Sequence, residues 1–380
     1  MGSGVAQVAA LAGHEVHLVD AREGAAAEAI ARLQATLHKL AAKGKFTAQQ
    51  ASDAASRLHV GASVAALPDC QLVVEAIVEN LDVKRQVFAE LAASQPSTTV
   101  LASNTSSLDI SAIAKGLAHP ERVIGLHFFN PAAIMKLVEV VHGDSSDHAL
   151  CDAIAKLVTS WGKTPVRCAS TPGFIVNRVA RPYYGEAQRL VQSGVCDAAT
   201  VDFCLTQAGF AMGPMALTDL IGHDVNYRVG ESVWEQTDRD PRYEPTACQK
   251  ALVDAGHFGR KTGQGFFRYV DGVAVDATPN EALAHQLMSG PVVTHPVART
   301  LAMLVNEAVD VVHRGEATAA DVDTAMRLGT NYPRGPIAWG AEIGFDVVEQ
   351  QLRELDAAFP GGRYRPSPAL AEAHAWALPA

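Results

Sequence analysis

Short apolar segments alternate with helix-like segments along the first part of the chain. The apolar segments lie at residues 14–20, 71–76, 99–103, 123–126, 137–141 and 165–168. Each has the length of a strand, and those between residues 71 and 141 are mainly apolar, as in buried strands. Helical periodicity fills long stretches between them, such as residues 25–58 with an interruption near Gly44. Strands and helices that alternate in this way predict an α/β fold with a doubly wound, mostly parallel sheet.

The later part of the chain has a helical pattern instead. Residues 171–174 mark a boundary ahead of a long predicted helix that contains Asn177 and Arg178. An ordered set of residues then occurs twice, which indicates an internal duplication of a helical module. The first set is Glu186, Gly194, Asp202, Pro214, Gly222 and Asp224, and the second is Glu307, Gly315, Asp323, Pro336, Gly344 and Asp346.

The two patterns predict four parts in the chain. An α/β domain occupies residues 1–168, and an all-α domain follows it. The all-α domain consists of a first helical module at 169–270, an irregular connector at 271–296 and a second helical module at 297–380.

The start of the chain has features of a dinucleotide-binding, Rossmann-type unit. A helix rich in small residues, at 1–13, precedes the strand that ends at Asp20. In such units this terminal acid binds the adenosine ribose, so Asp20 favours NAD, whereas Arg22 leaves open a 2′-phosphate and therefore NADP. The fingerprint G-x-G-x-x-G is represented only by its last glycine, taken as Gly2. We therefore expect an N-terminally truncated domain whose first strand is missing, with that strand's two neighbours lacking a partner.

Composition narrows the classes of partner and of site. The 380 residues carry a formal net charge of -10 without a Lys/Arg-rich run, which argues against nucleic acid and anionic membrane surfaces as partners. The six cysteines have no C-x-x-C spacing, which argues against a zinc site and a disulfide framework and favours a reduced, cytoplasmic setting. No apolar stretch approaches the roughly 18 residues that span a bilayer.

His127 and Glu139 are the first candidates for chemistry. His127 follows the apolar run at 123–126, so it lies near the end of a predicted strand, where open α/β sheets bind ligands. Glu139 lies within the apolar run at 137–141, where an unpaired carboxylate would be costly to bury. The pair would be a base and the acid that orients it. These two residues alone leave a second interpretation open, a core histidine and an unrelated glutamate.

Several longer segments resemble signatures of the 3-hydroxyacyl-CoA dehydrogenase family, in family order. They are GSGVAQVAALAGHEV, LVVEAIVENLDVKRQVF, SNTSSL, GLHFFNP with MKLVEVV, TPGFIVNR and FGRKTGQGFF. Two others, WGKTPVRCASTPGFIVNRVARPYY and DVDTAMRLGTNYPRGPIAWGAEIG, are similar to a bacterial long form with a doubled helical domain. That form is typified by the enzyme of phenylacetate catabolism that acts on 3-hydroxyadipyl-CoA.

The resemblance implies oxidation of an (S)-3-hydroxyacyl-CoA to the 3-oxoacyl-CoA with NAD, in phenylacetate or fatty-acid degradation. It implies that His127 is the catalytic base, that Glu139 is its partner, and that Ser106 and Asn177 bind the reacting oxygen or the thioester carbonyl. Positions near NAD are Gly2, Asp20, Glu79, Lys84, Asn104, Asn130 and Lys261, and positions near coenzyme A are Thr36 and Lys43. No metal is expected, because hydride transfer is the cofactor's own chemistry.

Three questions stay open at this point. A chain without the phosphate-binding loop could instead be a non-catalytic acyl-CoA-binding pseudoenzyme or a fragment. Another alternative is an NADP-linked 3-hydroxybutyryl-CoA dehydrogenase, which differs from the enzyme implied above only in cofactor and acyl chain. The acyl group is not identified, since Arg181 and Arg260 are only candidates for binding a distal carboxylate. The protein could be a homodimer, or a monomer in which the second helical module replaces the partner.

Overall fold

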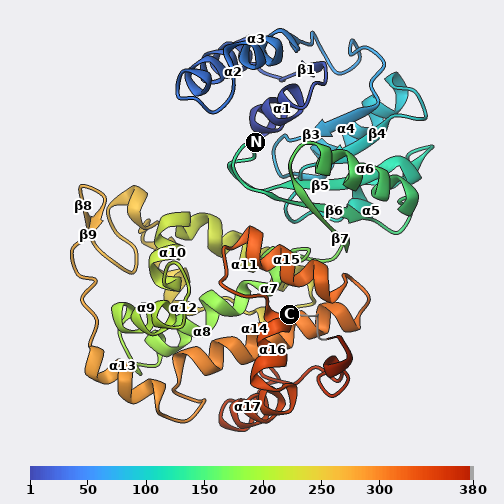
Figure 1. Ribbon diagram of the computed structural model, residues 1–380. Coiled ribbons are helices and arrows are strands. Elements are labelled where there is room, and N and C mark those ends of the chain that lie inside the picture. The colour runs from blue at the N-terminus through green and yellow to red at the C-terminus, as the bar shows by residue number, and fades with distance from the viewer. Residues whose placement is uncertain (377–380) are drawn as a thin grey trace. The chain divides into compact units, whose positions relative to one another are not determined.

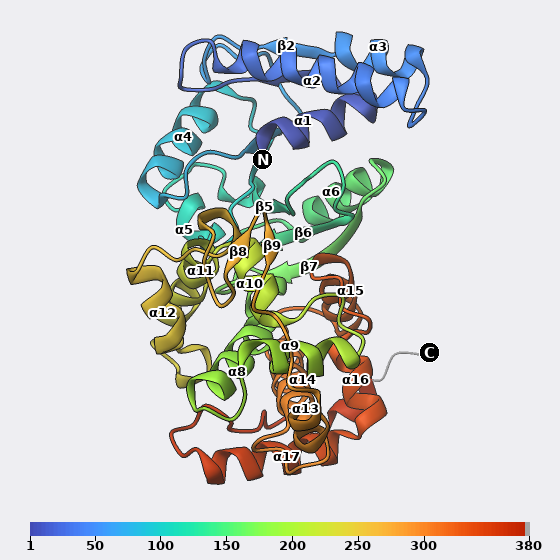
Figure 2. The same ribbon diagram turned by 90° about the vertical axis from the view of Figure 1, so that its left-hand side faces the viewer.

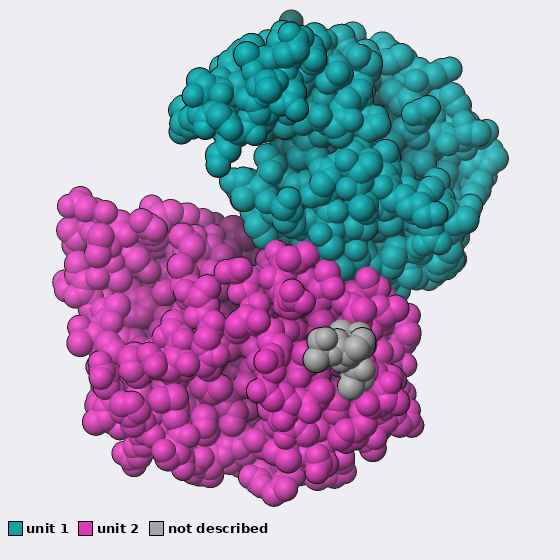
Figure 3. All heavy atoms as spheres, viewed as in Figure 1, with its two compact units in different colours: residues 1–171 teal, residues 172–380 magenta. Residues whose placement is uncertain are grey.

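The computed structural model describes residues 1–376 and divides the chain into two compact units, Met1–Thr171 and Pro172–Ala380 (Figure 3). The division falls three residues after the boundary expected from the sequence, because Ser170 is bound into the first unit. Its hydroxyl accepts from the backbone N–H of Ile110 and donates to Asp109. In the described part of the chain, no helix is both long and apolar enough to cross a membrane.

The first unit contains a five-stranded sheet in the order β3-β4-β5-β6-β7 (Figure 1). Its strands are β3 (Leu72–Glu75), β4 (Val100–Ser103), β5 (Val123–Phe128), β6 (Leu137–His142) and β7 (Thr164–Ala169). Only the β5–β6 pair is antiparallel. The sheet is therefore mostly parallel, as the alternating pattern predicts. The helices of this unit are α1 (Gly2–Leu11), α2 (Ala25–Ala42), α3 (Ala48–Ser56), α4 (Leu81–Ser94), α5 (Ile110–Ala114) and α6 (His148–Ser160), with the short 3-10 helix η1 (Pro120–Arg122).

A separate parallel pair, β1 (Val16–Leu18) and β2 (Leu58–Val60), completes the strands of this unit. Among residues 1–376, β1 pairs only with β2, and β3 pairs only with β4. The expected helical stretch 25–58 is wrong at its end, because Leu58 starts β2. The chain leaves the helix there since Leu58 is buried in a cluster with α1, α2 and α3, and its backbone joins the β1 ladder.

Two apolar cores hold the first unit together. One packs α6 on the sheet, with Ile154 and Val158 against strand residues such as Val138 and Val140. The other packs α1 against α2 and α3, where the small side chains Ala6 and Ala10 lie in one cluster with larger residues of α2. Small residues along α1 therefore permit close approach between helices.

The second unit is mainly helical. Its first part contains α7 (Val176–Val179), α8 (Arg181–Gln192), α9 (Ala198–Gln207), α10 (Pro214–Ile221), α11 (His223–Gln236), η2 (Pro241–Tyr243), α12 (Ala247–Asp254) and η3 (Arg260–Thr262). The short strands β8 (Tyr269–Val270) and β9 (Val273–Ala274) form a hairpin, which α13 (Glu281–Met288) follows. The last part contains α14 (Pro296–His313), α15 (Ala319–Gly329), α16 (Pro336–Ile343), α17 (Phe345–Ala358) and η4 (Ala373–Trp376).

The order α8-α9-α10-α11 recurs as α14-α15-α16-α17, and these helices can be followed in Figure 2. The two sets also share local hydrogen bonds and turns. Asp202 accepts hydrogen bonds from two backbone N–H groups of the first turn of α10, and Asp323 does the same for α16. Gly222 and Gly344 both have positive φ, 99° and 95°, where the third helix of each set turns into the fourth. The duplicated residues therefore perform the same structural tasks twice.

Helix α14 is the centre of the second unit. It packs against α7, α8 and α9 of the first module and against α15, α16 and α17 of the second (Figure 1). Two expectations differ from the structure here. The long helix expected around Asn177 is two helices, since Pro182, which has no N–H, occupies the first turn of a new helix that starts at Arg181. The connector is not irregular throughout, because it contains α13, which packs against α9 and α14.

Candidate active site

His127 and Glu139 are in direct contact. They lie opposite each other in the antiparallel β5–β6 pair, and His127 Nδ1 is 2.6 Å from Glu139 Oε2. The side chains are 8% and 1% exposed, so the carboxylate has the polar partner that its burial requires. The glutamate is therefore not unrelated to the histidine, because the two side chains are in contact. A hydrogen bond of this kind fixes the orientation and the tautomer of an imidazole ring.

Glu79 ties together the loops that follow β3 and β4. Its carboxylate accepts hydrogen bonds from the hydroxyl of Thr105, the hydroxyl of Ser107 at 3.0 Å and the backbone N–H of Ser106 at 3.2 Å. Burial raises the pKa of Glu79, but the hydrogen bond from Thr105 and the charge of Lys84 more than offset this and lower it. Glu79 is therefore held as a carboxylate next to Ser106.

Lys84 lies beneath these loops. Its ammonium is 2.7 Å from Glu75 Oε1 and 3.4 Å from Glu79, and its side chain is 1% exposed. Ser103 donates a hydrogen bond of 2.7 Å to the other oxygen of Glu75. The structure thus places Lys84 as an internal support that joins the ends of β3 and β4 to the start of α4.

Asn104 connects this cluster to the strand that carries His127. Its side-chain oxygen accepts a 2.9 Å hydrogen bond from the backbone N–H of Phe128, the residue after His127. Because β3, β4 and β5 are parallel, their carboxyl ends meet at one edge of the sheet. Glu79, Asn104, Ser106 and His127 therefore gather at that edge, where open α/β sheets bind ligands. Asn130, just beyond β5, is exposed.

The earliest candidates lie at the start of the first unit. A Cβ placed on Gly2 would be 3.7 Å from the Cβ of Ala76, so the N-terminus of α1 lies beside the residue that follows β3. Asp20 is exposed just after β1, and its carboxylate accepts a 2.9 Å hydrogen bond from the backbone N–H of Arg22. The guanidinium of Arg22 instead pairs with Glu28 at 2.7 Å.

Two candidates for coenzyme A lie on α2 and at its end. Thr36 is exposed and donates its hydroxyl hydrogen to the backbone oxygen of Arg32 within the same helix. Lys43 is an exposed residue at the C-cap of α2. Both side chains are accessible to an anionic ligand.

The remaining candidates belong to the second unit. Asn177 lies half-buried on the four-residue helix α7. Lys261 lies in η3, is 46% exposed and pairs with Asp224 at 2.6 Å. Arg181, a candidate for a distal carboxylate, lies over the ring of Tyr184 and donates to the backbone oxygen of Asn226, and burial lowers its pKa.

Comparison with known proteins identifies the family. The profile of the 3-hydroxyacyl-CoA dehydrogenase NAD binding domain matches residues 1–171, and the profile of the 3-hydroxyacyl-CoA dehydrogenase C-terminal domain matches residues 173–269 and 295–377. The chain belongs to the 3-hydroxyacyl-CoA dehydrogenase family. The second profile matches in two segments, one in each part of the duplicated helical unit.

Individual relatives of the dehydrogenase agree with this assignment. The Escherichia coli K12 3-hydroxyadipyl-CoA dehydrogenase is 39% identical, and the match covers 96% of this chain and 94% of that protein. The human mitochondrial hydroxyacyl-coenzyme A dehydrogenase is 38% identical and covers 71% of this chain and 88% of its own length. Among solved structures, the 3-hydroxybutyryl-CoA dehydrogenase from Escherichia coli K12 has a TM-score of 0.89 at 37% identity, covering 99% of this chain and 96% of that one.

The protein is therefore an NAD-dependent oxidoreductase that acts on a CH–OH group, and a non-catalytic acyl-CoA-binding protein is not favoured. The first unit offers groups that fit NAD. The backbone N–H groups at the start of α1 suit a phosphate, and the exposed carboxylate of Asp20 suits ribose hydroxyls. Arg22, which could have received a 2′-phosphate, is paired with Glu28.

Four residues that support this edge of the dehydrogenase were not singled out from the sequence as site residues. They are Glu75, Ser103, Thr105 and Ser107. Glu75 does leave a signal, because an acid at the end of an apolar strand needs a partner. The three hydroxyl residues leave none, since serine and threonine are ordinary residues of turns after strands.

Proposed function

We propose that the dehydrogenase oxidises (S)-3-hydroxyacyl-CoA with His127 as the general base and Glu139 as the acid that orients it. The observation that carries this proposal is the 2.6 Å contact between two side chains buried at a strand end. Histidine suits the role because its ordinary pKa of about 6.5 allows it to take up and release a proton near neutral pH.

The hydroxyl proton of the substrate would move to His127 at Nε2, since Nδ1 faces Glu139. Glu139 would keep Nδ1 protonated in the resting state and stabilise the imidazolium that forms when Nε2 accepts the proton. NAD would supply the hydride acceptor for the carbon that bears this hydroxyl group. The burial of the pair strengthens the interaction between carboxylate and imidazolium.

Ser106 and Asn177 would orient the substrate by donating hydrogen bonds to its reacting oxygen or to the thioester carbonyl. Support for Ser106 comes from its position in the loop after β4, where its backbone N–H donates to Glu79. Asn104 in the same loop accepts from the backbone N–H of Phe128, the residue after His127. Support for Asn177 comes from the TPGFIVNR segment, which matches the family signature. Each hydrogen bond that is stronger to the developing charge than to the ground state lowers the barrier.

We propose a role in binding the cofactor or coenzyme A for each of the remaining residues that the family resemblance implies. Asp20 would bind the adenosine ribose and Gly2 would lie at the pyrophosphate, while Glu79 and Asn104 would lie near the nicotinamide half. Lys84 would act by holding Glu79 in place. Asn130 and Lys261 complete the proposed NAD contacts. Thr36 and Lys43 are exposed and would bind the phosphates of coenzyme A.

For the acyl group we favour 3-hydroxyadipyl-CoA, with 3-hydroxybutyryl-CoA as the second candidate. The first is supported by similarity over 96% of this chain to a protein named for that substrate, and the second by similarity to a solved 3-hydroxybutyryl-CoA dehydrogenase. The corresponding pathways are phenylacetate and fatty-acid degradation, which would operate in the cytoplasm.

Initial rates of NAD reduction test this proposal. The purified protein is expected to reduce NAD with at least one of the two 3-hydroxyacyl-CoA substrates. A larger kcat/KM for the adipyl compound would support a receptor for the distal carboxylate, and a larger value for the butyryl compound would contradict it. Absence of turnover with either substrate, in protein shown to be folded, would contradict the enzymatic assignment.

A further inference from the structure

Two buried carboxylates in the second unit are bound by matching sets of side chains. Glu307 is held by Arg178, Arg242 and Tyr243, and Glu186 is held by Arg299, Arg363 and Tyr364. Each residue of the second set lies 121 positions after its counterpart, with Arg178 and Arg299 as one example and Tyr243 and Tyr364 as another. The exchange is reciprocal, since each module's glutamate is bound by the other module's arginines and tyrosine.

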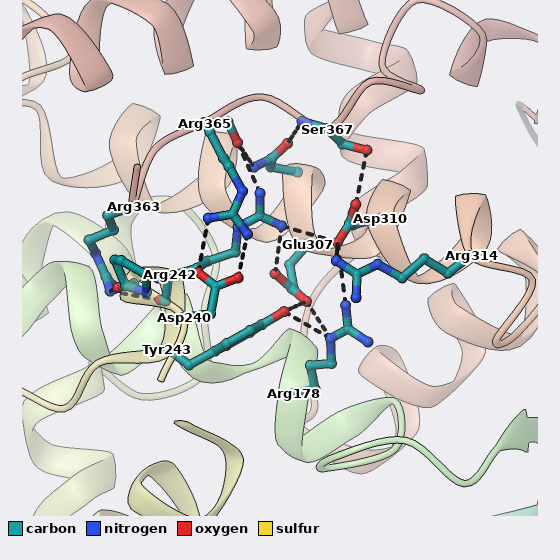
Figure 4. Close-up of polar contacts among 12 residues, drawn as sticks. Arg178, Asp240, Arg242, Tyr243, Glu307, Asp310, Arg314, Arg363, Arg365 and Ser367 are labelled. Carbon is teal, nitrogen blue, oxygen red and sulfur yellow. Dashed lines mark hydrogen bonds and ion pairs between the residues drawn. The ribbon is translucent and has the colours of Figure 1, made fainter. Parts of the chain in front are cut away.

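The contacts around Glu307 are short and almost fully buried (Figure 4). Arg178 Nε is 2.5 Å from Glu307 Oε1, and the hydroxyl of Tyr243 donates to the same oxygen at 2.6 Å. Burial alone would raise the pKa of Glu307, but Arg178 and Arg242 more than offset this and lower it. Arg178 also contacts Asp310 at 3.4 Å and Glu316, so three carboxylates of the second module surround it.

The contacts around Glu186 are equally close. Arg299 Nε is 2.6 Å from Glu186 Oε2, Arg363 Nη2 is 2.7 Å from Oε1, and the Tyr364 hydroxyl donates at 2.9 Å. Both glutamates are 0% exposed. Besides Glu186, Arg299 donates hydrogen bonds to a backbone oxygen and to the Tyr364 hydroxyl. Within residues 1–376, Glu186 is therefore its carboxylate partner.

The two halves of this exchange differ in what stands next to the arginine. Arg178 directly follows Asn177, whereas Arg299 directly follows Ala298. Only the first arginine is therefore directly preceded by a residue whose side-chain amide can donate a hydrogen bond to a substrate. Both helical modules therefore contain the glutamate, the two arginines and the tyrosine, whereas only the first module has the asparagine before its arginine.

The helix that carries Asn177 depends on tertiary contacts for its position. Helix α7 has four residues, far fewer than a helix needs to be stable alone. It packs against α14 and α15 of the second module. The loop before α7 also packs closely against the peptide group between Asn177 and Arg178. A Cβ on Gly173 would lie 3.0 Å from the backbone nitrogen of Arg178 and 3.2 Å from the carbonyl carbon of Asn177.

We propose that Arg178 is a positioning residue for Asn177, and that Glu307 of the second module sets its position. The second module then has a task in catalysis besides stability: through Glu307 and Arg178 it holds the amide that would bind the substrate. This inference rests on the proposed role of Asn177 as a substrate contact. A displacement of about 1 Å at such a contact can cost on the order of 100-fold in rate.

The pseudo-symmetric pair supplies a matched test, Glu307→Gln against Glu186→Gln. Each variant removes a buried charge from between two arginines and a tyrosine, so both are expected to lower the melting temperature. We expect Glu307→Gln to lower kcat for acetoacetyl-CoA reduction by at least about tenfold, with KM for NADH unchanged. Glu186→Gln should retain kcat at temperatures where both variants are folded. Equal losses of kcat in the two variants would overturn the inference.

A double-mutant cycle identifies the route of the effect. If Glu307 acts through Asn177, then Glu307→Gln lowers kcat no further in protein that already carries Asn177→Ala. Additive losses would overturn the inference. Failure of the proposed function is distinguishable, because Asn177→Ala alone would then leave kcat unchanged.

A milder variant keeps the test available if Glu307→Gln does not fold. Glu316 is 11% exposed and binds the Nη1 atom of Arg178. Glu316→Gln is expected to lower kcat in the same direction by a smaller factor, and to do so only when Asn177 is present. Unchanged kcat in folded Glu316→Gln protein would count against the inference.

Discussion

His127 and Glu139 stand opposite each other on antiparallel strands, with Nδ1 and Oε2 2.6 Å apart. Because both strands are central in the sheet and both side chains are buried, neither can move far without breaking the ladder around it. The pair is therefore set before a substrate arrives. This preorganisation is what a general base needs, since reorientation during the reaction would add to the barrier.

Replacement of His127 tests the proposed base. His127→Gln is expected to lower kcat for acetoacetyl-CoA reduction by about 100 to 10,000-fold, which is the range for loss of a positioned acid or base. NADH binding, followed by its fluorescence, should be retained because the proposed cofactor contacts lie on other residues. Unchanged turnover in folded, NADH-binding protein would refute the assignment.

The buried Lys84–Glu75 pair is expected to contribute mainly to stability. Lys84→Met leaves the Glu75 carboxylate without its cation, at a cost of about 3 to 5 kcal/mol in the free energy of unfolding by urea. The double variant Lys84→Met/Glu75→Leu should recover part of that loss, because it removes the uncompensated charge. A double variant less stable than Lys84→Met would contradict this.

An exposed pair provides the control for that measurement. Lys250 and Asp254 lie four residues apart on the surface of α12, with the ammonium 2.7 Å from the carboxylate. Lys250→Met should change stability little, because solvent screens exposed ion pairs. A loss as large as that of Lys84→Met would show that burial is not the deciding factor.

The Glu186 network makes stability depend on acid pH. Burial raises the pKa of Glu186, but Arg363 and Arg299 more than offset this and lower it from 4.5 to about 2. Below pH 4.5 the unfolded chain therefore binds a proton that the folded chain does not, so stability falls as pH falls. The contribution, about 3 kcal/mol, is fully present above pH 4.5 and lost as the pH falls through 2.

Urea unfolding at a series of pH values measures this dependence. The slope of stability against pH between 4.5 and 2 should be smaller in Glu186→Gln than in the parent protein, because the glutamine does not titrate. Identical slopes in the two proteins would mean that Glu186 does not titrate in this range.

Asp20 is expected to determine the preference for NAD over NADP. Asp20→Ser should lower kcat/KM for NAD by about tenfold or more, since hydrogen bonds to charged groups contribute about 1.5 to 3 kcal/mol. The substitution should also bring kcat/KM for NADP closer to the value for NAD, because it removes the repulsion between the carboxylate and a 2′-phosphate. An unchanged ratio of the two kcat/KM values would exclude this role.

Arg22→Ala is the matched control for cofactor choice. Arg22 is two residues from Asp20, but its guanidinium is paired with Glu28 at 2.7 Å. The ratio of NAD to NADP activity is therefore expected to stay the same in this variant. A fall in NADP activity alone would show that Arg22 leaves Glu28 to bind a 2′-phosphate.

Local pattern was sufficient for much of the fold. Apolar runs such as residues 123–126 and 137–141 become parts of β5 and β6, which are almost fully buried. Strands that are covered on both faces have such near-continuous apolar sequences. Local pattern failed where a tertiary partner overrode it. Leu58 joins β1 as a strand although it continues a helical stretch, and Pro182 starts a new helix where one long helix was expected.

The sequence by itself determined the types and order of the chemical groups: a histidine at a strand end, an acid in the next strand, and a glutamate and an arginine repeated 121 positions apart. Only the tertiary structure decided which of them meet. Strand register brings His127 to Glu139. Helix packing brings Glu307 to Arg178 of the first module, whereas Arg299 of its own module binds Glu186. Such pairings depend on contacts between segments far apart in the chain, and local periodicity holds no information about distances of that kind.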